Sequence, residues 1–238
     1  MIKKITGLVI KEIAYKDTSK IIDVLTKDGV YSVIAKGAKK VKSPLFLGTT
    51  FLSYSNFVIY EKENLSTLKS VDQIDSFKNI MQDITRISAA TYLVNISTQV
   101  YKQNTNSEIY DLLLLGLKKI NNGLDVLAIV NIIEVKLLKY LGLKIHLDNC
   151  VMCGGNDIVS LSLDYSGYLC KNCSKVIMDK KVLKLIKVYD NIDLNKLDSF
   201  NVSNDIVHIL DKFIDEYYLK YTGLYLNSKK FFKSVLEK

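Results

Sequence analysis

The four cysteines of this chain stand in two close pairs, and their spacing is typical of a metal site. Two residues separate Cys150 from Cys153, sixteen residues follow, and two residues again separate Cys170 from Cys173. Two intervening residues let both thiolates of a pair face one ion, and two such pairs complete a tetrahedral shell with sulfur about 2.3 Å from zinc. The sequence therefore predicts a structural zinc ribbon. A redox dithiol or a disulfide pair is the alternative.

The residues around the cysteines also favour a ribbon. Gly154 and Gly155 directly follow the first pair, where a positive φ and free backbone N–H groups can turn toward the sulfurs. Residues 161–169 have the pattern of a β-hairpin, and we expect Gly167 in its turn. Such a hairpin brings the second pair of cysteines beside the first.

Nothing else in the sequence assembles an active site. Four thiolates leave no open coordination position, so the ion is not expected to activate water. A zinc deaminase needs a His-x-Glu motif before its Cys-x-x-Cys, and neither His146 nor His208 provides one. For His146 we expect a hydrogen-bonded position beside the ribbon. The chain also lacks the common hydrolase, metalloprotease, Walker and dinucleotide motifs, so we predict that it is not an enzyme.

A lysine-rich loop before Pro44 is the second chemically distinctive segment. The formal net charge is +8, and residues 1–44 contain ten lysines against four acidic residues. Flexible ammonium groups beside small residues suit contacts with DNA phosphates, although lysine-heavy usage across a genome would also explain the charge. The predicted DNA-binding lysines are Lys36, Lys39, Lys40 and Lys42.

Aromatic residues on nearby segments offer surfaces on which bases stack in single-strand-binding barrels. Core packing is the alternative for each of them. These residues are Tyr31, Tyr54, Phe57 and Tyr60.

The first 77 residues have the pattern of short β-strands. The runs are rich in β-branched and aromatic residues, and Asp28-Gly29 between two of them is typical of a tight hairpin turn. The expected strands cover residues 8–10, 21–25, 30–34, 51–60 and 68–74. Five strands in a small basic segment predict an OB-fold barrel.

After residue 77 the apolar period becomes helical. Expected helices cover residues 80–100, 109–120, 126–141, 179–189 and 203–221, with Asn121-Asn122-Gly123 as a stop signal. The fold class is therefore α+β. We expect an OB-fold domain at residues 1–77 and a helical domain at residues 78–238, with the zinc ribbon inserted at about residues 147–177.

The sequence predicts a cytosolic protein. Its first residues do not form the apolar run of a signal peptide, and the most apolar later stretch, residues 124–143, is interrupted by polar residues such as Asn131 and Glu134. Four cysteines in a reducing compartment favour metal binding over disulfides.

Three stretches of the chain share the pattern of one known family. Residues 7–10, 17–26 and 35–43 match its opening strands and its Ala-Lys-Gly-Ala-basic-basic loop. Ile133-Glu134, Leu137-Leu138 and Leu141-Gly142-Leu143 before the first cysteine pair match its Phe-Glu, Leu-Leu and Leu-Gly-Tyr motifs. Residues 218–232, with Asn227-Ser-Lys-Lys, match its closing segment. Over nearly its whole length the chain thus resembles the bacterial DNA repair and recombination protein RecO family.

This resemblance implies a DNA-binding recombination mediator that is associated with the nucleoid. It implies binding to single- and double-stranded DNA, annealing of complementary strands, and loading of recombinase together with RecR on DNA that is covered by single-strand-binding protein. Lysine stands where the family often has arginine, and lysine does not make the bidentate guanidinium contact. The other readings are a zinc-ribbon scaffold or regulator without a role in DNA repair and a metal-dependent nuclease.

We predict that the helix expected at residues 126–143 contributes to a groove in the helical domain. This groove would bind the acidic, hydrophobic-ended tail of single-strand-binding protein. Lys136 and Lys139 border its apolar stripe, and a tail of this kind needs an apolar pocket together with a cation. The alternative is that the apolar residues are bundle core and that the lysines form a solvated face.

Overall fold

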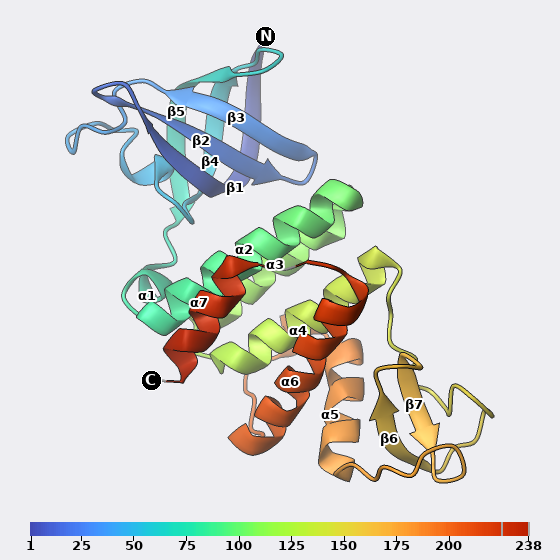
Figure 1. Ribbon diagram of the computed structural model, residues 1–238. Helices are drawn as coiled ribbons and strands as arrows, with labels where there is room; N and C mark the ends of the chain where they lie inside the picture. Colours follow the sequence, from blue (N-terminus) through green and yellow to red (C-terminus); the bar gives the residue numbers. More distant parts are fainter. Residues whose placement is uncertain (225, 238) are drawn as a thin grey trace.

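The computed structural model describes residues 1–224 and 226–237. Tyr225, which falls in the closing segment of the resemblance, and Lys238 lie outside the described residues. A β-barrel, a body of helices and a small ribbon follow one another in Figure 1. The predicted α+β class with an N-terminal five-stranded barrel is confirmed.

The barrel closes in the strand order β1-β2-β3-β5-β4. Its strands are β1 (Ile2–Tyr15), β2 (Ser19–Thr26), β3 (Gly29–Ala35), β4 (Tyr54–Tyr60) and β5 (Ser66–Asp75). β1 is much longer than the predicted run, because its first half pairs with β4 and its second half with β2 after a register shift between Val9 and Lys11. The seam between β3 and β5 is parallel and consists of two residue pairs.

Seven α-helices follow the barrel in the described residues. They are α1 (Lys78–Met81), α2 (Ile84–Gln103), α3 (Ser107–Asn121), α4 (Val126–Leu138), α5 (Lys180–Asn191), α6 (Asn204–Tyr221) and α7 (Asn227–Leu236). Short 3-10 turns cover Leu47–Thr49, Lys139–Leu141 and Leu194–Lys196.

The ends of these helices follow from local side-chain chemistry. Asp83 and Asp125 accept hydrogen bonds from the backbone N–H groups of Arg86 and Ala128, which satisfies donors that a helix start leaves without a partner. Gly123 takes a φ of +91° just after α3, so the predicted stop signal is confirmed. α7 was not expected from the sequence as a separate helix.

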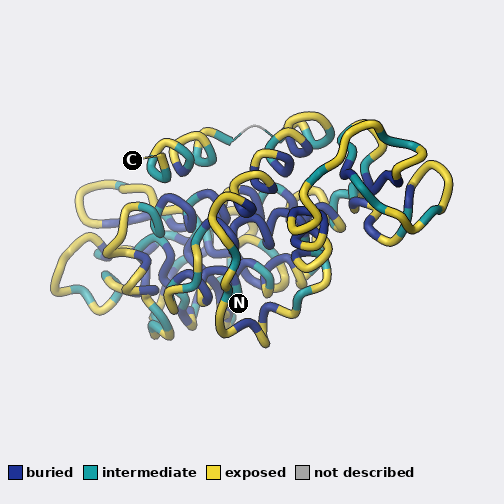
Figure 2. The backbone as a smooth tube through the Cα atoms, turned by 90° about the horizontal axis from the view of Figure 1, so that it is seen from below, coloured by how far each residue is buried: buried dark blue, intermediate teal, exposed yellow. Residues whose placement is uncertain are grey.

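The core of the helical body surrounds α4. Eleven of its thirteen residues are buried, and the dark blue tube in the middle of Figure 2 shows how deeply the helices lie. α4 contacts α2, α3, α5 and α6. A helix that is apolar all round is stable in water only with such cover.

The barrel packs directly on the helices. Three leucines of the barrel domain pack in the apolar core of the helical body and not in the core of the barrel. They are Leu8, Leu25 and Leu52. Lys27, in the β2–β3 turn, adds an ion pair to Asp111 at 2.9 Å, and its carbonyl accepts the Tyr101 hydroxyl at 3.1 Å.

The ribbon consists of a two-stranded sheet, β6 (Ile158–Ser162) and β7 (Gly167–Cys170), between α4 and α5. The expected position of Gly167 in the hairpin turn is wrong. The turn covers residues 163–166, with Ser166 at a φ of +51°, and Gly167 begins β7. A Cβ on Gly167 would lie 2.7 Å from the carbonyl oxygen of His146, so glycine serves a close approach of two backbones there.

Within residues 1–224 and 226–237, no helix combines the length and the apolar character that crossing a membrane requires.

Candidate metal centre and nucleic-acid interface

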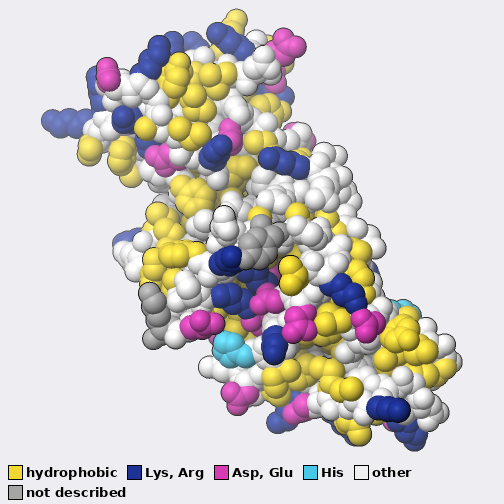
Figure 3. All heavy atoms as spheres, viewed as in Figure 1, with side chains coloured by type: hydrophobic (Ala, Val, Ile, Leu, Met, Phe, Trp, Pro, Cys, Tyr) yellow, Lys and Arg dark blue, Asp and Glu magenta, His cyan; other side chains and the backbone are white. Residues whose placement is uncertain are grey.

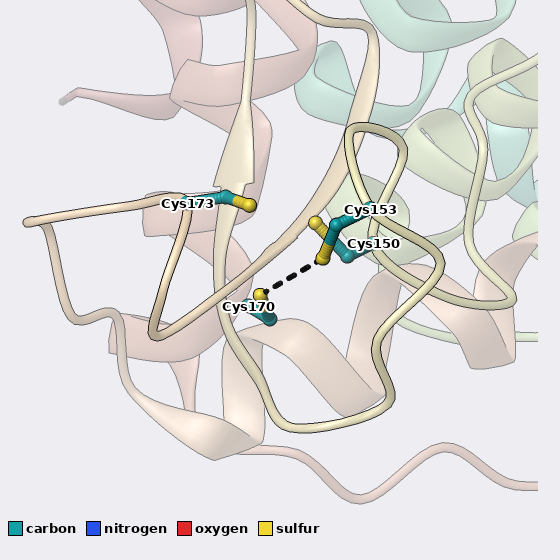
Figure 4. Close-up of side chains that lie close together, drawn as sticks. All are labelled: Cys150, Cys153, Cys170 and Cys173. Carbon is teal, nitrogen blue, oxygen red and sulfur yellow. Dashed lines mark hydrogen bonds between the residues drawn. The ribbon is translucent and has the colours of Figure 1, made fainter.

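The ribbon brings the four cysteine sulfurs to one point. Their Sγ atoms all lie within 4.8 Å of one another, and those of Cys153 and Cys170 are 3.5 Å apart. Figure 4 shows the four side chains converging from two loops and the end of β7. Zinc bound to four sulfurs at about 2.3 Å sets those sulfurs about 3.8 Å apart in a regular tetrahedron. The residues therefore fit a tetrahedral metal ion.

Backbone hydrogen bonds hold each pair of cysteines in its loop. The Cys150 N–H donates to the Gly155 carbonyl and the Gly154 N–H to the Cys150 carbonyl, at 2.9 and 2.8 Å. Gly154 takes a φ of +73°, as predicted, and a Cβ on Gly155 would stand 3.4 Å from the Cys153 sulfur. The Val151 N–H donates to the Tyr168 carbonyl at 2.9 Å and so joins the first pair to β7.

In the absence of a cation, hydrogen bonds within the cysteine cluster shift the pKa values of the thiols. Burial opposes ionisation of Cys150, but hydrogen bonds from the backbone N–H groups of Cys170 and Cys153 lower the pKa of its thiol to about 6. The Cys173 thiol donates a hydrogen bond to Cys153, and this bond, together with burial, raises the pKa of the Cys173 thiol to about 12. One thiolate forms easily, whereas the later ones need a positive charge in the centre.

His146 lies beside the ribbon and outside the sulfur cluster. Its Nε2 is 2.7 Å from Oδ1 of Asn149, and its backbone pairs with Gly167 of β7. The expected hydrogen-bonded position of this residue is confirmed.

The predicted basic loop begins where β3 ends at Ala35. Successive turns, with Gly37 at a φ of +71°, carry the chain out of the sheet. The Lys39 N–H donates to the Thr18 carbonyl in the β1–β2 turn at 2.9 Å, while the Ala38 side chain is fully buried in the barrel core. The loop is therefore fixed at one end of the barrel, although it has no regular structure.

The four lysines of this loop all point to solvent. Lys36, Lys39, Lys40 and Lys42 are exposed, and no ion pair in the described ranges involves any of them. In Figure 3 lysine side chains stand out around the barrel. Unpaired ammonium groups keep their charge available for a polyanion. Lys16 is a further exposed lysine at this end of the barrel, and the sequence reasoning did not name it. Its backbone carbonyl lies 3.4 Å from the Lys39 Nζ.

The four aromatic residues of the barrel do not share one surface. Phe57 is buried in the barrel core and Tyr54 packs against the core cluster of the helical body. Tyr31 is half-buried and accepts a hydrogen bond from the Lys3 Nζ at 2.8 Å. Tyr60 is 44% exposed, and the Lys69 Nζ lies over its ring at 6.0 Å from the centroid.

Lys136 and Lys139 have different surroundings at the end of α4. Lys136 is half-buried and donates to the Asp190 carbonyl at 3.0 Å, and burial lowers the pKa of its ammonium group. Lys139 is exposed and lies 3.3 Å from Oε2 of Glu108. The apolar residues of α4 are bundle core, and Lys136 but not Lys139 lines a neighbouring cavity of about 780 Å³ between α3 and residues 192–195.

Sequence reasoning missed a cluster of buried charges that fastens α7. Glu134 in α4 is fully buried, and its Oε1 accepts the Tyr92 hydroxyl at 2.5 Å and the Lys229 ammonium group. Lys229 also pairs with Asp215, to which Lys233 is bound at 2.9 Å. Burial raises the pKa of the Glu134 carboxyl. A lone acid in an otherwise apolar helix was the signal that could have revealed this cluster.

Comparison with known proteins assigns the whole chain to one family. The model for "Recombination protein O N terminal" matches residues 1–77, and that for "Recombination protein O C terminal" matches residues 81–230. The chain is 31% identical to the DNA repair protein RecO of Bacillus pumilus, over 99% of this chain and 95% of the relative. The protein of the same name from Shouchella clausii is 32% identical over the same shares.

A further relative of that name, from Listeria monocytogenes, is 31% identical over 98% of this chain and 94% of its own length. The barrel, the helical body and the cysteine cluster thus occur in a chain that aligns with these DNA repair proteins from end to end. The chain belongs to the recombination protein O family of DNA repair proteins.

Proposed function

We propose that this protein is a DNA-binding recombination mediator whose barrel contacts DNA through the loop of Lys36, Lys39, Lys40 and Lys42. One observation carries the proposal: all four lysines are exposed without an ion pair, in a loop fixed at one end of a barrel of the OB type. Membership of a DNA repair family supports DNA as the polyanion.

Within this proposal the protein anneals complementary strands. Together with RecR it helps to load recombinase on DNA that is coated with single-strand-binding protein. It acts on single- and double-stranded DNA in the nucleoid. Residues 1–77 are the DNA-binding OB-fold domain, and residues 78–238 are the helical domain with the ribbon at about 147–177. The ends of the two matching family models support this division.

The ion in the ribbon is zinc, bound by Cys150, Cys153, Cys170 and Cys173. The all-sulfur donor set and the distances between the sulfurs support zinc over harder ions, which prefer oxygen. Its role is structural, since four thiolates complete the shell.

The acidic tail of single-strand-binding protein is a further proposed partner, with Lys136 and Lys139 as its cations. The cavity beside Lys136 supports this site, but the hydrogen bond to Asp190 and the proximity of Lys139 to Glu108 would both have to open. Reversing the charge of both lysines should weaken binding of the tail peptide and leave the binding of naked DNA unchanged. A peptide that binds the reversed variant equally well places the tail elsewhere.

Binding of single-stranded DNA at several salt concentrations tests the main proposal. Replacing Lys39 and Lys40 by alanine removes two phosphate contacts. The slope of log affinity against log salt concentration should therefore fall by about 1.4, and binding to all DNA sequences should weaken alike. A variant with Lys78 and Lys212 replaced loses the same charge from exposed sites on the helices and is the control.

Three results would contradict parts of the proposal. A wild-type chain that binds no DNA would favour a scaffold or regulator, and cleavage of labelled DNA in the presence of magnesium would favour a nuclease. An unchanged slope in the Lys39 and Lys40 variant would move the DNA site away from this loop.

A further inference from the structure

A cavity of about 490 Å³ opens where the barrel meets the helices. β1, β2 and β3 form one wall, α2 a second and the first turn of α7 a third, so that three distant parts of the chain border it. Lysine side chains lie along the seam between barrel and helices in Figure 3. We call this cavity the seam crevice. It is separate from the cysteine cluster and from the basic loop.

The seam crevice has a positive border. Lys11 of β1 and Lys102 of α2 line it, both are exposed, and neither takes part in an ion pair in the part of the chain that the structure describes. Among the described lining residues the one carboxylate is Asp23, which accepts the Ser32 hydroxyl at 2.6 Å. Asp23 lies opposite Lys11 in the pairing of β1 with β2, so two lysines against one aspartate leave the border with a net positive charge.

Two hydroxyl groups of the lining lack a partner. The Oγ1 of Thr98 and the Oγ of Ser228 are shielded from solvent, and the described residues offer neither a hydrogen bond. Thr91, two turns earlier on α2, instead donates to the Ile87 carbonyl at 2.7 Å, which is the usual solution for a helical threonine. A shielded hydroxyl without an acceptor is unfavourable. Because both oxygens are closed to solvent in this conformation, the groups that a ligand can reach are the lysines and amides of the lining.

Amide side chains of the lining offer further donors. Asn95 and Gln99 lie one helical turn apart on α2, and no hydrogen bond of either side chain occurs among the described residues. α7 begins after Leu226 without a side-chain cap, which leaves first-turn N–H groups beside Ser228. A ligand with several acceptor oxygens and a negative charge, such as a phosphate, satisfies ammonium and amide donors together. Val30 and Val94 give the same crevice an apolar side that suits a sugar or a base.

We infer that the seam crevice binds a phosphate group of a nucleic-acid strand and so continues the path of the strand from the barrel onto the helices. This inference rests on the proposed DNA binding. The phosphate of a free nucleotide or inorganic phosphate has the same chemistry and is distinguished by experiment.

The test compares two double variants of the full chain. Replacing Lys11 and Lys102 by alanine removes both cations of the crevice, and replacing Lys78 and Lys212 removes two exposed lysines that do not line it. Each is titrated with a labelled single-stranded oligonucleotide over a range of salt. The crevice variant should bind about tenfold more weakly at low salt, with a salt slope that is lower by about 1.4, whereas the control changes less than about twofold.

Equal losses in the two double variants would overturn the inference. If the Lys39 and Lys40 variant binds the oligonucleotide as tightly as the wild type while the crevice variant binds it more weakly, the basic loop is not a DNA contact and the crevice is. If the wild-type chain binds no oligonucleotide, its melting temperature with inorganic phosphate is compared with that in chloride of equal ionic strength. If phosphate raises the melting temperature of the wild type but not that of the crevice variant, the crevice is a site for free phosphate. If phosphate does not raise the melting temperature of the wild type, the crevice is not a phosphate site.

Discussion

Single residues decide the metal centre, because each cysteine supplies one quarter of the shell. Elemental analysis should find about one zinc per chain. Replacing Cys153 by serine should release the ion and unfold the ribbon, since the binding energy of a structural metal is also folding energy. Zinc-free protein that retains four titratable thiols after purification without chelator would contradict this prediction.

A second prediction at this scale concerns pH. Burial raises the pKa of Glu134 above its usual value of 4.5, so the folded chain binds a proton here more readily than the unfolded chain does. The free energy of unfolding that Glu134 contributes is therefore fully present below pH 4.5 and is lost as the pH rises through the folded pKa.

Denaturation of the wild type and of a Glu134→Gln variant at several pH values measures this effect. The stability advantage of the wild type should shrink from pH 5 upward and then become constant. An advantage that grows with pH would show that the paired Lys229 keeps the carboxyl ionised throughout.

The residues that carry chemistry were predictable where spacing alone defines them. The Cys-x2-Cys pairs and the lysine loop are local patterns, and the structure brings the four sulfurs together as expected. The buried charges were not predictable in this way, since Glu134 and Lys229 are 95 residues apart and only the packing of α7 on α2 brings them together.

At the scale of elements, the ribbon hairpin gives an opposed pair of substitutions. Gly167→Ala places a Cβ 2.7 Å from the His146 carbonyl oxygen and should destabilise the ribbon by about 1–3 kcal/mol. Ser166→Gly relieves a φ of +51° and should stabilise it by up to about 1 kcal/mol. Thermal unfolding of the zinc-loaded chain measures both, and a stabilising alanine at position 167 would contradict the close approach.

Most helices and strands were visible in the apolar period, and the exceptions have physical causes. β1 is longer than its apolar run because it pairs with two different strands. α7 was not predicted because its inner face does not have a simple apolar period. Lys229 and Lys233 lie on that face and pair with the buried carboxylates of Glu134 and Asp211. Gly167 suggested a turn, but the contact that requires glycine is with His146, outside the hairpin.

For the whole molecule, the decisive contact is the apolar one between barrel and helices. Leu25 belongs to the helical core cluster although it lies on β2, so Leu25→Ala should cost about 2–5 kcal/mol. The exposed pair Lys27–Asp111 should contribute at most about 1 kcal/mol, and Lys27→Ala is the matched control. In calorimetry the leucine variant should unfold in two steps, whereas a single transition in both variants would mean that the barrel and the helices do not depend on this contact.

Membership of the recombination protein O family of DNA repair proteins agrees with the prediction of a chain that is not an enzyme. The relative placement of barrel, helices and ribbon was beyond sequence reasoning, because Leu8, Leu25 and Leu52 look like ordinary strand residues in an isolated pattern. The seam crevice between barrel and helices was missed for the same reason.

The distance along the chain between Glu134 and Lys229 also governs how the protein is made. A ribosome adds about 5–20 residues per second, so the 95 residues that separate them take about 5 to 20 s to synthesise. During this interval the nascent α4 carries an acid whose partner does not yet exist. The helical body therefore reaches its final packing only after α7 has left the exit tunnel, whereas the barrel, complete by Asp75, is free to fold long before.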